Sequence, residues 1–259
     1  MYAAAAPPSR ISRCLVGDCR CERFYDPEAR ELAWLSFAHQ IGVPKRLREA
    51  VSQCADRTAS ALVDGQGRLH LRAEGTDALT RVERYLRADF AVGRCLVLAG
   101  PTGVGKSFAA VVALRAASGT STAPESRRFS YFPELCGGLL DPGRRQDMLT
   151  RAKTTEFIVL DDFGVEYAKE GGLVDAFLDE IIWTREANCL PTIITTNLSV
   201  EALKARLPER LIDRLRGQWG AVYECPGRSL RHPSQRPGEP QQREPGSATT
   251  ETIADVEAR

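Results

Sequence analysis

Residues 100–107 have the sequence GPTGVGKS, in which three spaced glycines precede a lysine and a serine. The eight residues are Gly100, Pro101, Thr102, Gly103, Val104, Gly105, Lys106 and Ser107. The apolar run Cys95–Ala99 comes before them and predicts a buried strand, and the Ala-rich residues 108–117 after them predict a helix. Strand, loop and helix in this order match the phosphate-binding pattern G-x-x-x-x-G-K-[ST]. The sequence therefore predicts a site for ATP.

The composition of the loop suits this chemistry. Glycines let the backbone adopt positive φ angles and approach a pyrophosphate closely. The loop N–H groups then meet phosphate oxygens at a helix N-terminus, where the helix dipole favours negative charge. We expect Lys106 to contact the β- and γ-phosphates and Ser107 to hold Mg²⁺. A glycine-rich turn that matches the pattern by chance is the alternative.

The overall composition narrows the class of protein. The chain has 259 residues, of which 43% are hydrophobic and 27% charged, as in soluble globular proteins. Its net charge of +1 predicts no general attraction to nucleic acid or membrane, so such contacts would need a local patch. No apolar run approaches the roughly 20 residues of a membrane span, and the first residues do not resemble a signal peptide. We expect a cytoplasmic protein without a membrane partner.

Three of the eight cysteines, Cys14, Cys19 and Cys21, lie close together in the sequence. They would bind zinc only if a fourth ligand such as His39 or Cys54 completed a tetrahedral site. Their C-x4-C-x-C spacing is not a standard zinc pattern. We therefore expect surface cysteines without metal, and a zinc site is the alternative.

The chain divides into four parts by composition. A disordered N-terminus (1–13) and a small helical region (14–75) precede a nucleotide-binding core (76–231), and a Pro-rich polar tail (232–259) is predicted to be disordered. In the core, strands alternate with helices, which predicts an α/β fold with a five-stranded, largely parallel sheet flanked by helices. The expected strands are 95–99, 129–132, 157–161, 192–196 and 221–225.

Aromatic residues gather on one predicted helix of the N-terminal region. Trp34 and Phe37 share a helical face with apolar neighbours. This face is either a docking surface for a partner protein or packs within a small helical domain.

Two further apolar strands end in polar residues suited to catalysis. Four apolar residues precede Asp161 and Asp162, which would lie at the carboxyl end of a central strand, where ligands bind in open α/β sheets. Asp161 is a candidate ligand for Mg²⁺, and Asp162 is a candidate base for the attacking water. Asn197 follows the strand at 192–196 and either contacts the γ-phosphate or caps the next helix.

Basic residues near the C-terminal end of the core are candidates for contacts with phosphate. Arg210 and Arg214 share one helical face, where either is a candidate arginine finger for a neighbouring subunit. The competing interpretation is a solvated face whose arginines pair with Glu209 and Asp213. Arg228, just after the last strand, is a candidate for contact with nucleotide in the same chain.

In this order the motifs resemble the AAA+ family of P-loop ATPases, and within it the group of bacterial helicase loaders typified by DnaC. The related transposition helper IstB shares the same core. The resemblance extends over about residues 76–231, and its most specific segments are 100–107, 160–164, 194–198 and 209–215. It implies ATP hydrolysis at a site shared between subunits of an oligomer, with Asn197 as sensor 1, Arg214 as the finger in trans and Arg228 as sensor 2. The Asp161-Asp162 pair departs from the Asp-Glu pair of many AAA+ proteins.

The same resemblance implies a replicative helicase and single-stranded DNA as partners. Four cations between the second and third strands are candidates for the DNA contact, and a solvated helix face explains them equally well: Arg144, Arg145, Arg151 and Lys153. Two alternatives keep the nucleotide site but change its use: a transposition helper that delivers a transposase to DNA, and a nucleotide-gated DNA-binding scaffold with little hydrolysis.

Overall fold

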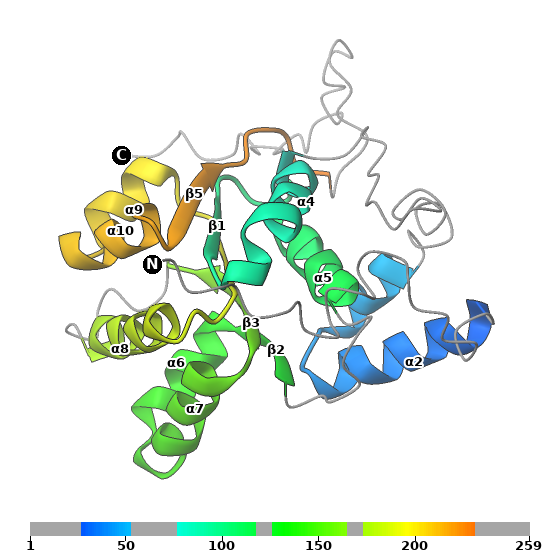
Figure 1. Ribbon diagram of the computed structural model, residues 1–259, viewed down its shortest axis with the longest axis horizontal. Helices are drawn as coiled ribbons and strands as arrows, with labels where there is room; N and C mark the ends of the chain where they lie inside the picture. The colour runs from blue at the N-terminus through cyan, green and yellow to red at the C-terminus, as the bar shows by residue number, and fades with distance from the viewer. Residues whose placement is uncertain (1–26, 53–76, 118–125, 165–172, 231–259) are drawn as a thin grey trace, which may run out of the picture.

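Five apolar strands lie side by side and are covered on both faces, which is why they contain almost no charged residues in their centres. A computed structural model describes residues 27–52, 77–117, 126–164 and 173–230. All strand pairs are parallel, in the order β2-β3-β4-β1-β5 (Figure 1). The strands are β1 (Cys95–Ala99), β2 (Arg127–Tyr131), β3 (Phe157–Phe163), β4 (Thr192–Thr196) and β5 (Gly220–Glu224). The predicted α/β fold with a five-stranded parallel sheet is confirmed.

Five strand boundaries differ from the prediction: β2 begins two residues earlier and ends one earlier, β3 ends two residues later, and β5 begins and ends one residue earlier. Two of these differences have a physical reason. β2 begins at Arg127 rather than at 129, because the Arg127 guanidinium is buried and donates to the carbonyl of Ala117. β3 continues to Phe163 beyond the predicted end at 161, because the strand resumes its pairing with β4 after an irregularity. Because β2 begins with Arg127 and Arg128 and β3 includes Asp161 and Asp162, a search for apolar runs does not detect these ends of the strands.

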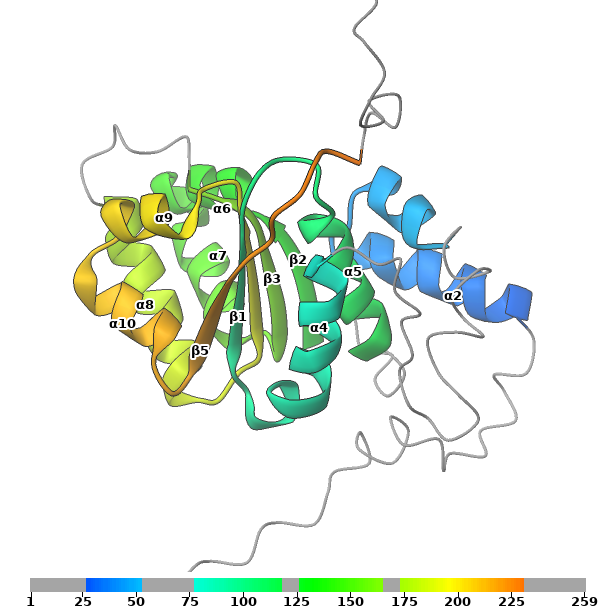
Figure 2. The ribbon, with the colours of Figure 1, turned by 90° about the horizontal axis from the view of Figure 1, so that it is seen from above.

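Helices cover both faces of the sheet (Figure 2). On β1, Leu96 and Leu98 point into one apolar cluster with α4 and α5, while Cys95 and Val97 point into a second cluster with α6, α7, α8 and α10. This alternation is the two-residue period of a strand buried on both sides. The helices are α2 (Pro27–Gln40), α4 (Asp77–Ala88), α5 (Lys106–Ala117), α6 (Phe132–Leu140), α7 (Pro142–Thr154), α8 (Leu173–Ala187), α9 (Val200–Arg206) and α10 (Glu209–Arg216), with a 3-10 turn η2 (Phe90–Val92).

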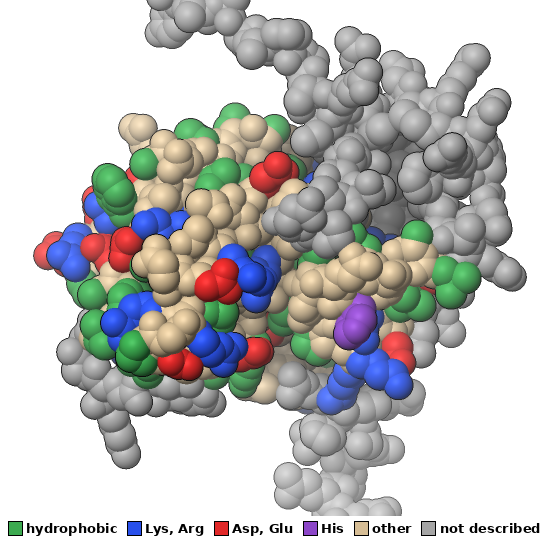
Figure 3. Space-filling view, turned by 90° about the horizontal axis from the view of Figure 1, so that it is seen from below, with side chains coloured by type: hydrophobic (Ala, Val, Ile, Leu, Met, Phe, Trp, Pro, Cys, Tyr) green, Lys and Arg blue, Asp and Glu red, His purple; other side chains and the backbone are tan. Residues whose placement is uncertain are grey.

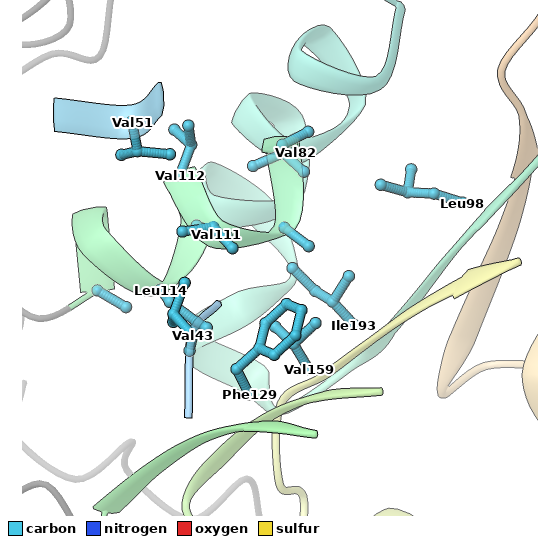
Figure 4. Packing of buried hydrophobic residues seen from close by; sticks show 14 of the residues in the cluster. Val43, Val51, Val82, Leu98, Val111, Val112, Leu114, Phe129, Val159 and Ile193 are labelled. Carbon is cyan, nitrogen blue, oxygen red and sulfur yellow. The ribbon is translucent and has the colours of Figure 1, made fainter. Parts of the chain in front are cut away.

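The described part of the N-terminal region packs onto the core. Figure 4 shows Val43 and Val51 near Leu114 and Val112 of α5. Trp34 on α2 is only 6% exposed and belongs to the same apolar cluster. The Arg115 guanidinium lies 5.4 Å from the Trp34 ring centroid and pairs with Glu31. The Trp34 side of α2 is therefore packed against the core and is not an exposed docking surface.

One buried arginine joins several elements of the fold. Arg185 on α8 has no exposed surface and makes five hydrogen bonds. Its guanidinium donates to Thr192 Oγ1 at 2.8 Å and to four main-chain carbonyls, those of Ala152, Thr155, Glu156 and Pro191. These acceptors lie at the end of α7 and at the starts of β3 and β4, so a single side chain links the three elements.

Some predictions fall outside the described residues. They include the N-terminus (1–13), the tail (232–259) and the cysteines Cys14, Cys19, Cys21 and Cys54. Among the helices that the structure does describe, none has the length and apolar character to span a bilayer.

Candidate functional site

The loop at residues 100–107 connects β1 to α5 at the carboxyl edge of the sheet. Gly100 and Gly103 have φ angles of 128° and 88°, in the region that favours glycine. A Cβ atom on Gly100 would lie 2.5 Å from the carbonyl oxygen of Cys225, and one on Gly103 would lie 2.2 Å from Ser229 Oγ. The backbone geometry that a phosphate-binding loop needs is thus possible only with glycine at these two positions.

Lys106 connects this loop to the end of β4. Its side chain is 4% exposed, and Nζ donates to the carbonyls of Gly100 and Pro101, each at 2.7 Å. Nζ also donates to Asn197 Oδ1 at 3.2 Å. The ammonium group is therefore held inside the loop, next to the residue predicted to contact the γ-phosphate.

Asp161 and Asp162 lie at a break in the pairing of β3 with β4. Asp161 is buried and accepts a hydrogen bond from Thr195, whose Oγ1 is 2.6 Å from Asp161 Oδ1. Burial raises the pKa of the Asp161 carboxyl, and the hydroxyl groups of Thr195 and Ser107 act in the opposite direction. The predicted metal residues Ser107 and Asp161 thus lie close to one another.

Asp162 has a positive φ of 62°, which is uncommon for a residue other than glycine. Asn197 Nδ2 donates to Asp162 Oδ1, and the Tyr131 hydroxyl donates to Asp162 Oδ2 at 3.5 Å. Asn197 is not the cap of the next helix, because Ser199 caps α9 with a hydrogen bond from Ala202 N to its Oγ. The capping interpretation of Asn197 is therefore wrong.

These side chains suit Mg²⁺ and a nucleoside triphosphate. Mg²⁺ prefers oxygen ligands and keeps several waters, so a hydroxyl and a carboxylate close to one another are an adequate donor set. The glycine loop is packed so closely against Cys225 and Ser229 that no side chain fits at Gly100 or Gly103, and a buried ammonium group lies beside the loop. Within the described ranges no group of three or more His, Cys, Asp and Glu residues could hold a metal ion by itself.

The segment after β5 passes along the phosphate-binding loop. Cys225 N donates to the carbonyl of Ala99 at 2.7 Å, and Leu230 N donates to the carbonyl of Gly103 at 2.9 Å. Arg228 lies between these two anchors and is exposed. The structure thus places the predicted sensor 2 arginine on a segment bonded to the loop.

Arg214 lies far from the loop within its own chain. Its helix, α10, leads into Trp219, whose carbonyl accepts from Cys95 N at the start of β1, whereas the loop follows the end of β1. Arg214 pairs with Asp179 and Glu186 of α8, at 2.9 and 3.3 Å. Arg210 pairs with the same Asp179, at 3.2 Å. Arg210 and Arg214 thus pair with α8 rather than with Glu209 and Asp213.

The cations of α7 are mostly engaged within the chain. Arg151 pairs with Asp147 and Lys153 pairs with Glu180. Arg145 donates to the carbonyl of Leu139 and lies over the ring of Phe177. Figure 3 views the molecule from the side on which Figure 1 shows α7, and basic and acidic side chains lie next to one another there. Arg144 is exposed, and in the described ranges it forms no ion pair.

Comparison with known proteins gives structural matches only. No family model matches the chain, and no curated protein does. A putative primosome component from Streptococcus pyogenes serotype M3 is 18% identical and has a TM-score of 0.53, over 79% of this chain and 99% of that one. The chain therefore shares the fold of this protein over most of both lengths.

Two further structures match with lower TM-scores. A DnaC helicase loader is 24% identical with a TM-score of 0.49, over 66% of this chain and 100% of that one. DnaI is 25% identical with a TM-score of 0.45, over 59% of this chain and 81% of that one.

Two residues of the candidate site were not singled out from the sequence. Thr195 contacts both acidic residues, and Tyr131 contacts Asp162 from the end of β2. Thr195 lies two residues before Asn197 in a strand that the sequence predicts to be buried throughout, so its side chain was expected on a buried face. The partner on that face depends on how β3 and β4 are aligned, and no signal in the sequence reveals that alignment.

Proposed function

We propose that this chain binds Mg²⁺-ATP, hydrolyses it, and acts in DNA replication as a loader of a replicative helicase that also binds single-stranded DNA. The observation that carries the nucleotide part is the hydrogen-bonded set Lys106–Asn197–Asp162, with Ser107 and Asp161 close to one another beside it. A lysine, an amide and two carboxylates converge on a glycine loop at the carboxyl edge of a parallel sheet. This is where open α/β sheets bind their ligands.

Each residue has a task that its position supports. Lys106 and the loop N–H groups bind and orient the phosphates, and Ser107 and Asp161 hold Mg²⁺. When bound, Mg²⁺ neutralises charge on the phosphate oxygens. Asp162 orients the attacking water and accepts its proton, and Asn197 Nδ2 keeps the Asp162 carboxylate in place. Arg228 contacts the nucleotide in the same chain.

We further propose that the chain assembles with copies of itself through the nucleotide site. Arg214 would then reach the γ-phosphate of a neighbouring subunit as an arginine finger. In the single chain it is held by two acidic residues of α8, so assembly has to release it from Asp179 and Glu186. We also propose a helical region at 14–75 and a nucleotide-binding core at 76–231, with residues 27–52 packed into the apolar cluster of the core.

The Asp162→Asn variant tests hydrolysis. Asparagine keeps the oxygen that accepts from Asn197 but removes the negative charge, so we expect ATP turnover to fall at least about 100-fold while ATP affinity changes less than about threefold. Steady-state turnover and fluorescent nucleotide titration measure the two effects. Asp213→Asn, on the exposed part of α10, is the matched control and should turn over ATP like the unmodified protein. Equal turnover in Asp162→Asn would contradict the catalytic role of Asp162, and no turnover in the unmodified protein would favour the scaffold alternative.

The client is tested by direct binding. We expect the immobilised protein to retain a purified replicative helicase in the presence of ATP and single-stranded DNA, and not to retain a transposase of the class that AAA+ helpers deliver. Retention of the transposase alone would support the transposition alternative and contradict the loader assignment. The motif resemblance to the DnaC group is what makes the helicase our first choice.

A further inference from the structure

Thr195 lies between the two acidic residues of the site and bonds to both. Its side chain is 1% exposed on β4. The hydroxyl donates to Asp161 Oδ1 at 2.6 Å and accepts from the main-chain N–H of Asp162 at 3.0 Å. A hydroxyl is the smallest group that can donate and accept in this way at once.

The alignment of the strands explains why a side chain is needed there. Leu160 is paired with Ile194, and Phe163 is paired with Thr196, so β3 has one residue more than β4 in this interval. Such an extra residue is a β-bulge, in which part of the ladder of main-chain hydrogen bonds is lost. The bulge contains Asp162, with its φ of 62°. Thr195 Oγ1 accepts the Asp162 N–H in place of a ladder carbonyl.

The second bond of the hydroxyl sets the direction of a carboxylate. Because Thr195 donates a hydrogen bond to Asp161 Oδ1, rotation of the Asp161 carboxylate is restricted. The Thr195 hydroxyl thus bonds to the side chain of Asp161, the candidate Mg²⁺ ligand, and to the backbone of Asp162, the candidate base.

We propose that Thr195 is a positioning residue that presents Asp161 to Mg²⁺ and holds the bulge that presents Asp162 to the attacking water. This inference rests on the Mg²⁺-ATP site proposed above. It predicts a defect in the use of Mg²⁺, which loss of packing alone would not produce.

The test compares Thr195→Val, which keeps the shape but removes the hydroxyl, with Thr195→Ser, which keeps the hydroxyl. Thr196→Val is the matched control: Thr196 is also buried on β4 and has two hydrogen bonds, with the Phe163 carbonyl and Leu198 N, but none with either acid. Three quantities are measured: the Mg²⁺ concentration for half-maximal binding of a fluorescent ATP analogue, the affinity for that analogue without Mg²⁺, and kcat with KM.

For Thr195→Val we expect the Mg²⁺ concentration for half-maximal binding to rise at least about tenfold and kcat to fall at least about tenfold, because a hydrogen bond to a charged group is lost. The affinity for the ATP analogue without Mg²⁺ should stay within about threefold of that of the unmodified protein. Thr195→Ser should stay within about threefold of the unmodified protein in all three. Thr196→Val should lose thermal stability to a similar degree but keep its Mg²⁺ requirement. If Thr195→Val does not fold, Thr195→Ala replaces it with the same expectation.

An equal Mg²⁺ requirement in Thr195→Val and Thr196→Val would overturn the inference, as would a serine variant as impaired as the valine variant. Failure of the proposed function gives a different result, because the unmodified protein would then show no Mg²⁺-dependent nucleotide binding, and the inference would fail with it. If the unmodified protein binds but does not hydrolyse ATP, the Mg²⁺ dependence of binding still decides the role of Thr195.

Discussion

Replacing Lys106 by alanine is expected to weaken ATP binding by at least about 100-fold. The change removes a buried cation whose charge-assisted hydrogen bonds to phosphate contribute about 1.5–3 kcal/mol each. In the structure, Nζ is held by the carbonyls of Gly100 and Pro101 and by Asn197, so the ammonium group is already positioned at the loop. Titration with a fluorescent ATP analogue measures the loss.

Two controls separate this effect from a general loss of structure. Lys204→Ala removes an exposed lysine of α9 and should leave ATP affinity unchanged. The thermal unfolding midpoint of the Lys106 variant shows whether the loop still folds when the bonds to its own carbonyls are lost. ATP affinity within about threefold of the unmodified protein would contradict the assignment of residues 100–107 as the nucleotide site.

Replacing Arg185 by methionine is expected to lower the free energy of unfolding by about 3–5 kcal/mol. The substitution leaves buried carbonyls at the end of α7 and the starts of β3 and β4 without a donor, and each such group costs about 1–3 kcal/mol. Burial lowers the pKa of the Arg185 guanidinium to about 10, so the group remains charged at neutral pH. Urea-induced unfolding, followed by tryptophan fluorescence, measures the change.

The comparison with an exposed arginine makes this prediction specific. Arg151→Met breaks an exposed ion pair with Asp147 and should cost about 0.5 kcal/mol or less. Arg185→Lys should be intermediate, because an ammonium group has three donors and cannot reach all the acceptors of a guanidinium. An equal loss in the free energy of unfolding for Arg185→Met and Arg151→Met would show that the hydrogen bonds of Arg185 to the three elements do not stabilise the fold.

Much of the fold was predictable because its signals are local. The strands 95–99 and 192–196 are continuous apolar or β-branched runs, and both have the bounds that the sequence predicts. Arg127 was missed as the start of β2, because its burial depends on the Ala117 carbonyl, which only the folded chain brings near. The Trp34 face was left open between two interpretations, because the surface that covers it belongs to α5.

The sequence predicted which residues belong to the candidate site, but not which of them bond to one another. Asp161, Asp162 and Asn197 follow apolar strands, and the rule that ligands bind at the carboxyl ends of parallel strands brings them to one edge. The bond between Asn197 and Asp162 joins residues 35 positions apart, and it forms only because β3 and β4 are neighbours. Likewise, the acidic partners of Arg214 lie on α8 rather than on its own helix.

The residues of the glycine loop specify its geometry by themselves, because the dihedral angles that a phosphate-binding turn needs are a property of each residue. The two acids differ in this respect. Their order in the chain identifies them as candidates, but the bulge that orients them arises from the register between two strands. The register of two strands depends on contacts between distant parts of the chain. The Thr195 hydroxyl, which accepts the Asp162 N–H in place of a ladder carbonyl, is therefore brought to Asp162 only by the tertiary structure.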